Sequence, residues 1–133
     1  MARTRQKPSD VRAKLLELMK KERYGRLSDA HVFLVNRDTD FMEEYDALFR
    51  FLMTKDRRLR VKEKELIVIG MLAVKGQYNA MKGHVRRALL AGVQVDQMVE
   101  VLELAMLYGG TESMIQGGLA MLDVLKELGQ KSP

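Results

Sequence analysis

Apolar side chains recur every three to four residues along most of this chain, which is the spacing of one face of an α-helix. The pattern predicts six helices, over about residues 9–23, 41–53, 66–74, 78–91, 96–107 and 111–128. The two prolines, Pro8 and Pro133, stand at the ends of the 133-residue chain, so no proline interrupts these stretches. We therefore expect an all-α protein.

Four of the predicted helices begin at or just after a Ser, Thr or Asp. We expect the side-chain oxygen of each of these residues to cap the helix N-terminus by accepting a hydrogen bond from a backbone N–H of the first turn. These residues are Ser9, Asp40, Asp96 and Thr111. Gly129 is expected to end the last helix, because glycine readily adopts the left-handed conformation that often follows a helix. Residues 24–38 lack a regular pattern, and we expect them to form a connector.

The stretch 66–74 is apolar on every side, so it must be enclosed by other helices or by a second subunit. Glu65 stands at its start and is expected to be at least partly buried. If the chain reverses near Gly76-Gln77, then Glu65 and His84 lie on neighbouring helices with an offset of four residues, or about 6 Å along the axis. Two side chains can span that gap directly or through one intervening atom.

The surroundings of His84 suggest room for a small ligand. Ala80, Ala88 and Ala91 lie on the same side of the predicted helix, and these small residues either admit another helix or leave space beside the imidazole. Arg87 follows one turn after His84, on the same side. Its guanidinium could hold a carboxylate in a bidentate pair.

Residues 59–128 resemble the carboxymuconolactone decarboxylase and alkyl hydroperoxidase D-like superfamily. The resemblance is carried by Leu59, Glu65-Leu66-Ile67, His84, Ala88-Leu89, Gly92, Glu100-Val101 and Tyr108-Gly109-Gly110. It implies a single six-helix domain over residues 1–133 of the hydroperoxidase D-like fold, with residues 1–58 as divergent N-terminal helices. It also implies a homotrimer or homohexamer.

Peroxidases of this superfamily carry a Cys-X-X-Cys pair before the histidine, and this chain departs from that pattern. Gln77 and Ala80 stand at the two cysteine positions, and the chain contains no cysteine. A thiolate is the nucleophile of that branch, so the sequence disfavours peroxidase activity. The decarboxylase branch keeps the histidine without the cysteines and is the nearer match.

The decarboxylase resemblance implies a lyase that needs no cofactor and acts on a small carboxylated lactone or a related acid. The namesake reaction removes carbon dioxide from γ-carboxymuconolactone to give an enol-lactone, in aromatic catabolism. His84 and Glu65 are the implied catalytic residues. Arg87, Tyr108 and Gln77 are the predicted substrate-binding residues, with the Tyr108 ring packing inside and its hydroxyl reaching a polar cavity.

Each of these roles has an alternative that the sequence leaves open. A histidine beside an apolar helix face is often a structural group, and Glu65 is equally suited to accept hydrogen bonds from His84 as an inert carboxylate. The sequence does not decide which of the two is the proton donor. The competing function is a non-catalytic member of the superfamily that serves as an oligomeric binding scaffold.

Charge and composition bear on three further properties of the protein: nucleic-acid binding, metal binding and membrane contact. The net charge of +5 arises in residues 1–26, which carry nine Lys or Arg against three Asp or Glu, but aromatic residues are nearly absent there apart from Tyr24. We interpret this stretch as a solvated face, with nucleic-acid binding the less favoured alternative. Two histidines and no cysteine disfavour a transition-metal site. Without a long apolar run or a signal peptide, we expect a cytoplasmic protein with no membrane contact.

Overall fold

The computed structural model of the protein describes residues 7–23 and 27–129, and every regular element in these ranges is an α-helix. Seven helices lie there: α1 (Pro8–Glu22), α2 (Asp29–Arg37), α3 (Thr39–Met53), α4 (Val61–Val74), α5 (Tyr78–Leu90), α6 (Val95–Gly109) and α7 (Thr111–Glu127). The predicted all-α class is confirmed, whereas the predicted number of six helices is wrong.

The additional helix is α2, which lies inside the stretch predicted to be a connector. Ser28 caps it by accepting a hydrogen bond from the backbone N–H of His31 over 3.3 Å. Asp38 ends α2 and also caps α3, where its side chain accepts from the backbone N–H of Phe41. Local capping thus makes a nine-residue helix where the apolar spacing is too short to show one. Tyr24 lies outside the described residues.

Most of the predicted caps lie within one or two residues of the observed ones. Pro8 occupies the first turn of α1, so the helix begins before Ser9. Gln94, rather than Asp96, caps α6: its backbone N–H donates to the side chain of Gln97 over 2.9 Å. Gly110 precedes α7 with φ +85°, a conformation that glycine tolerates, and leaves Thr111 as the first helical residue.

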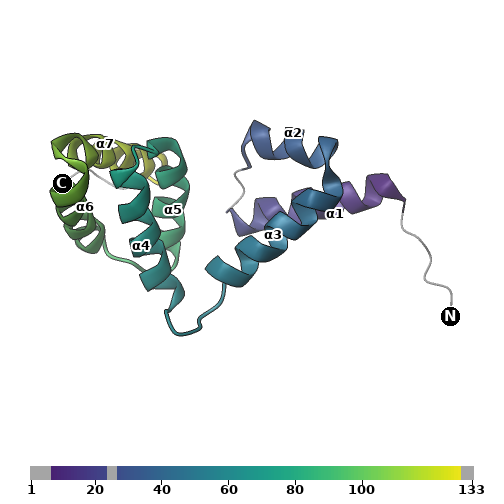
Figure 1. The fold of residues 1–133 in the computed structure, drawn as a ribbon, viewed down its shortest axis with the longest axis horizontal. Helices are drawn as coiled ribbons and strands as arrows, with labels where there is room; N and C mark the ends of the chain where they lie inside the picture. The colour runs from purple at the N-terminus through teal and green to yellow at the C-terminus, as the bar shows by residue number, and fades with distance from the viewer. Residues whose placement is uncertain (1–6, 24–26, 130–133) are drawn as a thin grey trace. The chain divides into compact units, whose positions relative to one another are not determined.

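The helices form two compact units, which meet in the chain between Thr54 and Lys55. In the first unit, α1, α2 and α3 pack on one another (Figure 1). Its buried apolar core is small and consists of Leu15, Met19, Val35 and Met42. So few buried apolar side chains make a marginal core, so the polar contacts within this unit are important for its stability.

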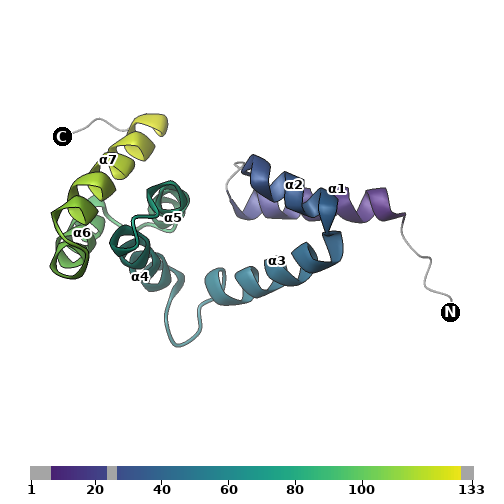
Figure 2. The same cartoon turned by 45° about the horizontal axis from the view of Figure 1, so that its top comes forward.

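The second unit is a four-helix arrangement in which α4 packs between α5 and α6, and α7 crosses them (Figures 1 and 2). Its core draws on all four helices and is larger. The buried residues are Ile69, Ala73, Met81, Val85, Ala88, Val93, Met98, Leu102, Ala105, Ala120, Met121 and Val124. No helix in the described part of the chain is both long and apolar enough to span a membrane.

Candidate active site

Glu65 is a charged residue at the centre of the second unit. It lies in the second turn of α4, and its side chain is completely shielded from solvent. Ile69 and Ala73 follow at four-residue intervals on the same face and are equally buried. A carboxylate placed so deep requires partners that satisfy its charge and its hydrogen bonds.

His84 on α5 is the first of these partners. Its Nδ1 lies 2.8 Å from Glu65 Oε2. The hairpin of α4 and α5 therefore brings the two residues into direct contact, which is one of the two arrangements that the four-residue offset allows. An ionised carboxylate only accepts hydrogen bonds, so the proton of this contact is on Nδ1, and Nε2 is the ring nitrogen left for other partners.

Arg87 is the second partner. Its Nε donates to Glu65 Oε1 over 2.8 Å, and its side chain is 8% exposed. Both oxygens of Glu65 are thus engaged by groups that α5 presents one turn apart. This arrangement fixes the carboxylate and neutralises it, which a buried charge pair requires in order to persist.

The exposure of the three side chains decides which of them can meet a small molecule. Glu65 is 0% exposed and Arg87 8%, whereas His84 is 19% exposed. His84 is therefore the member of this Glu65–His84–Arg87 cluster that reaches the surface. Ala88, beside it on α5, is buried in the core, and Ala80 is exposed.

The structure does not bring Gln77 and Tyr108 to this cluster. Gln77 is exposed and precedes α5, seven residues or about 10 Å along the helix axis from His84. Tyr108 is 86% exposed at the end of α6. The prediction that its ring packs inside is wrong for this chain by itself, because nearly all of the side chain is open to solvent. Their substrate-binding roles stay predictions.

Tyr108 instead lines an apolar groove of about 570 Å³ between α4 and α6. The floor is formed by Leu66, Ile67, Gly70, Met71, Val74, Val101, Leu104 and Ala105. Successive residues of a helix are rotated by about 100°, so Ile67 and Met71 lie on the side of α4 opposite to Glu65. The groove and the Glu65–His84–Arg87 cluster are two separate features of the second unit.

The contact between Glu65 and Arg87 is the main feature that sequence reasoning missed. Pairing residues at equal distances from the turn sets Glu65 opposite Ala88, and Arg87 is the neighbour of Ala88. The register therefore already indicated that Arg87 lies near Glu65, but the prediction paired Arg87 with a substrate carboxylate instead. In the residues that the structure describes, no three His, Cys, Asp or Glu side chains cluster in a way that could hold a metal ion.

Comparisons with known proteins identify the family of the chain and a similar fold. The sequence profile of the carboxymuconolactone decarboxylase family matches residues 39–123, from the start of α3 into α7. The fold is similar to the crystal structure of a candidate carboxymuconolactone decarboxylase from Burkholderia xenovorans LB400, with a TM-score of 0.74 and 20% sequence identity. The likeness covers 92% of this chain and 97% of the other. The comparison with curated proteins gave no match.

Proposed function

Because the chain belongs to the carboxymuconolactone decarboxylase family, we propose that it is a carboxy-lyase that needs no cofactor and acts on a small carboxylated lactone or related acid. The observation that carries the proposal is the Glu65–His84–Arg87 cluster. A buried carboxylate orients a partly exposed imidazole, which is the arrangement of a positioned acid or base. The absence of cysteine in the sequence directs the proposal to the decarboxylase branch.

His84 is the proposed proton donor. As an imidazolium it gives the cluster a net charge of +1, since Glu65 and Arg87 cancel each other. A substrate carboxylate is attracted to that charge. Glu65 stabilises the imidazolium through Nδ1 and does not itself reach the substrate, because its side chain is completely buried.

The proposed step balances without a co-reactant. The bond between the carboxyl carbon and the lactone ring breaks, and its electron pair moves toward the lactone carbonyl as carbon dioxide leaves. His84 Nε2–H then delivers its proton to the ring carbon, and the imidazole regains a proton from water. Arg87 acts on this step through Glu65, so we assign it as a positioning residue.

Absorbance of γ-carboxymuconolactone in the ultraviolet measures this activity directly. We expect turnover by the purified protein, and a loss of about 10²- to 10⁴-fold in kcat for His84→Asn. Glu65→Gln keeps the size of the side chain but removes its charge, and we expect a loss on the order of 10²-fold. The matched controls are His31→Asn in the first unit and Glu63→Gln, a partly exposed residue in the first turn of α4, and both should retain activity.

Two results would count against the proposal. Turnover that survives in His84→Asn would remove His84 from the chemistry. If the wild-type protein is folded by circular dichroism but gives no turnover, γ-carboxymuconolactone is not its substrate.

The apolar groove between α4 and α6 favours a second candidate, a non-catalytic member that serves as a binding scaffold. The groove excludes all three residues of the Glu65–His84–Arg87 cluster, so binding there does not require His84. Calorimetry with small carboxylic acids separates the two candidates. Binding that His84→Asn abolishes supports the lyase site, whereas binding that survives unchanged in His84→Asn supports the scaffold.

A further inference from the structure

Two acidic side chains are buried together in the first unit, far in the sequence from the residues of the proposed lyase site. Glu22 is at the end of α1 and its side chain is 10% exposed, and Asp46 is in the middle of α3 and is 0% exposed. Both carboxyl groups contact the same two guanidinium groups, those of Arg23 and Arg50, so they lie side by side. Two carboxyl groups that share a buried site repel each other when both are ionised, which favours a proton held by the pair.

Two arginines accompany the acids. Arg23 Nη1 donates to Asp46 Oδ1 over 3.2 Å and lies 3.6 Å from Glu22 Oε2. Arg50 Nε lies 3.3 Å from Glu22 Oε1 and 3.4 Å from Asp46 Oδ2. The Arg23 guanidinium also stacks over the ring of Phe49 at 4.5 Å. These contacts tie the end of α1 to α3 through charged groups.

The helix α2 contributes one titratable group to the same region. His31 is within electrostatic range of Arg23 and Asp46, and burial, followed by the charge of Arg23, lowers its pKa below 6.5. His31 is therefore neutral at pH 7 and adds no positive charge. Among the residues that the structure describes, the cations in contact with the acid pair are then Arg23, which follows α1, and Arg50 of α3.

Opposing effects act on the Glu22 carboxyl, and their sizes differ. Burial and the neighbouring Asp46 favour its protonated form, whereas Arg50 and Arg23 favour the ionised form. The arginines are 38% and 13% exposed, so water screens their charges, while the two acids face each other out of water. Burial and Asp46 prevail, and together they raise the pKa of Glu22 to about 7.

We propose that the Glu22–Asp46 pair is a pH-dependent latch that holds α1 against α3 while it carries a proton and loosens α1 when the proton is lost. Only Leu15 and Met19 of α1 are buried in the small core of the first unit. Because few apolar contacts hold α1, loss of the latch is enough to loosen it. Loss of the proton leaves two adjacent buried carboxylates that repel each other. Separation of α1 from α3 relieves the repulsion by admitting water.

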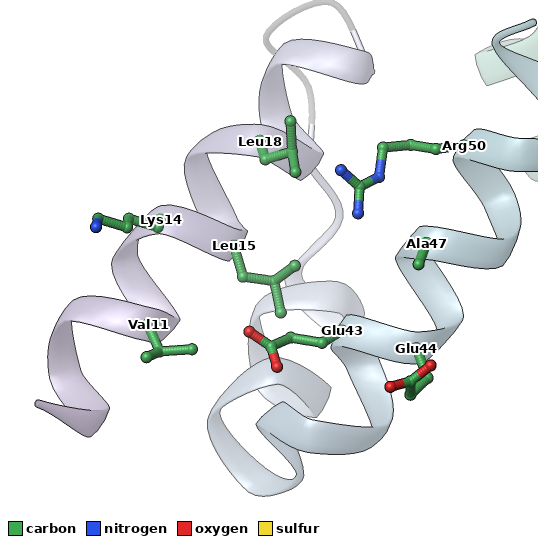
Figure 3. Close-up of a pocket in the computed structure, with 8 residues that line it drawn as sticks. All are labelled: Val11, Lys14, Leu15, Leu18, Glu43, Glu44, Ala47 and Arg50. Atoms are coloured by element: carbon green, nitrogen blue, oxygen red, sulfur yellow. The ribbon is translucent and has the colours of Figure 1, made fainter. Parts of the chain in front are cut away.

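A cavity beside the latch gives water a short route. It has a volume of about 370 Å³ and lies between α1 and α3, where Arg50 reaches from α3 toward Leu18 on α1 (Figure 3). Glu43 and Glu44 line its other end, with Leu15 between the two helices. Because Arg50 contacts both this cavity and the acid pair, movement of α1 opens the pair directly toward the cavity.

Hydrogen exchange of the full chain, read by mass spectrometry on peptides from α1, tests the latch. The folded unit binds the proton more tightly than the open one. The contribution of this proton to the stability of the closed unit is therefore fully present below pH 4.5 and is lost as the pH rises through about 7. After correction for intrinsic exchange, we expect opening of α1 to increase about tenfold between pH 6 and pH 8 and to level off above. Equal protection at both values would overturn the proposal.

Glu22→Gln is the informative variant, because it imitates the protonated carboxyl at every pH. We expect its α1 protection to be the same at pH 6 and pH 8, while Glu17→Gln, an exposed residue on the same helix, keeps the wild-type dependence. A Glu22→Gln protein that retains the tenfold change would contradict the latch. The carbon-13 titration of the Glu22 carboxyl in the wild-type protein is a second measurement that needs no variant. A midpoint near 7 supports the latch, and one near 4.5 overturns it.

Discussion

Arg87 donates its Nε–H to Glu65 Oε1 over 2.8 Å, and both side chains are more than nine-tenths buried. This pair links α5 to α4 in the centre of the second unit. A buried pair adds little net stability as a whole, but removal of one partner strands the other charge out of water. The pair is therefore expected to be sensitive to single substitution.

Arg87→Met should lower the free energy of unfolding by about 3–5 kcal/mol, because Glu65 then remains buried with only His84 as a partner. The control is Arg86→Met, which removes the Arg86–Glu127 pair, in which both side chains retain access to solvent. That change should cost no more than about 1 kcal/mol. Urea unfolding followed by circular dichroism measures both values. Equal losses for the two variants would show that Arg87 has no special role.

Two adjacent glycines in α7 should respond in opposite directions to alanine. A Cβ on Gly117 would lie 2.6 Å from Leu102 Cδ2, whereas a Cβ on Gly118 meets nothing within 4 Å. Gly117→Ala should therefore cost about 1–3 kcal/mol through overpacking of α6 against α7. Gly118→Ala should stabilise the helix by about 0.5–1 kcal/mol, since it restricts the unfolded chain.

Thermal unfolding of the two glycine variants, recorded side by side, gives the comparison. Two alanine variants with the same change in melting temperature would mean that Leu102 moves aside freely. The contact of α6 with α7 would then be looser than the structure shows.

Lys82 on α5 and Asp123 on α7 form an ion pair at the surface, with Nζ of the half-buried lysine 2.8 Å from Oδ2 of the exposed aspartate. The hydrogen bond from Lys82, and then its charge, hold the pKa of Asp123 below its ordinary value of 3.8. The stabilisation is present above pH 3.8 and is lost as the pH falls through the lowered pKa. Carbon-13 titration should show the midpoint moving up toward 3.8 in Lys82→Met. Lys126→Met should move it less, because Lys126 contributes least to the shift.

The sequence predicted the second unit better than the first, for physical reasons. The apolar run after Glu65 and the glycine at position 76 define a helical hairpin, and a hairpin fixes which residues face each other. That register placed Glu65 and His84 within reach of each other on neighbouring helices, and the structure shows them in direct contact at 2.8 Å. In the first unit, α2 depends on hydrogen bonds of Ser28 and Asp38, which apolar periodicity does not register.

The periodicity of apolar residues did not show how the buried charge of Glu65 is paired. The prediction placed Arg87 near a substrate because one helical face holds both His84 and Arg87. It did not weigh that a fully buried Glu65 requires a cation more than a surface ligand does. The same limit applies to Glu22 and Asp46, whose contact joins residues 24 positions apart on two helices with no fixed register between them.

The exposed groove between α4 and α6 supports the expected homo-oligomer. Ile67, Met71 and Leu104 are 47%, 52% and 57% exposed, and a continuous apolar surface of this kind is typical of protein contacts. Size-exclusion chromatography with light scattering should give a mass that is a multiple of 15.2 kDa.

Met71→Glu places a charge in the centre of the groove and should shift the population toward the monomer. Leu90→Glu, at an exposed apolar residue of α5 outside the groove, should leave the mass unchanged. A wild-type protein that is monomeric at every concentration would contradict the prediction, and a shift in both variants would place the contact elsewhere than in the groove.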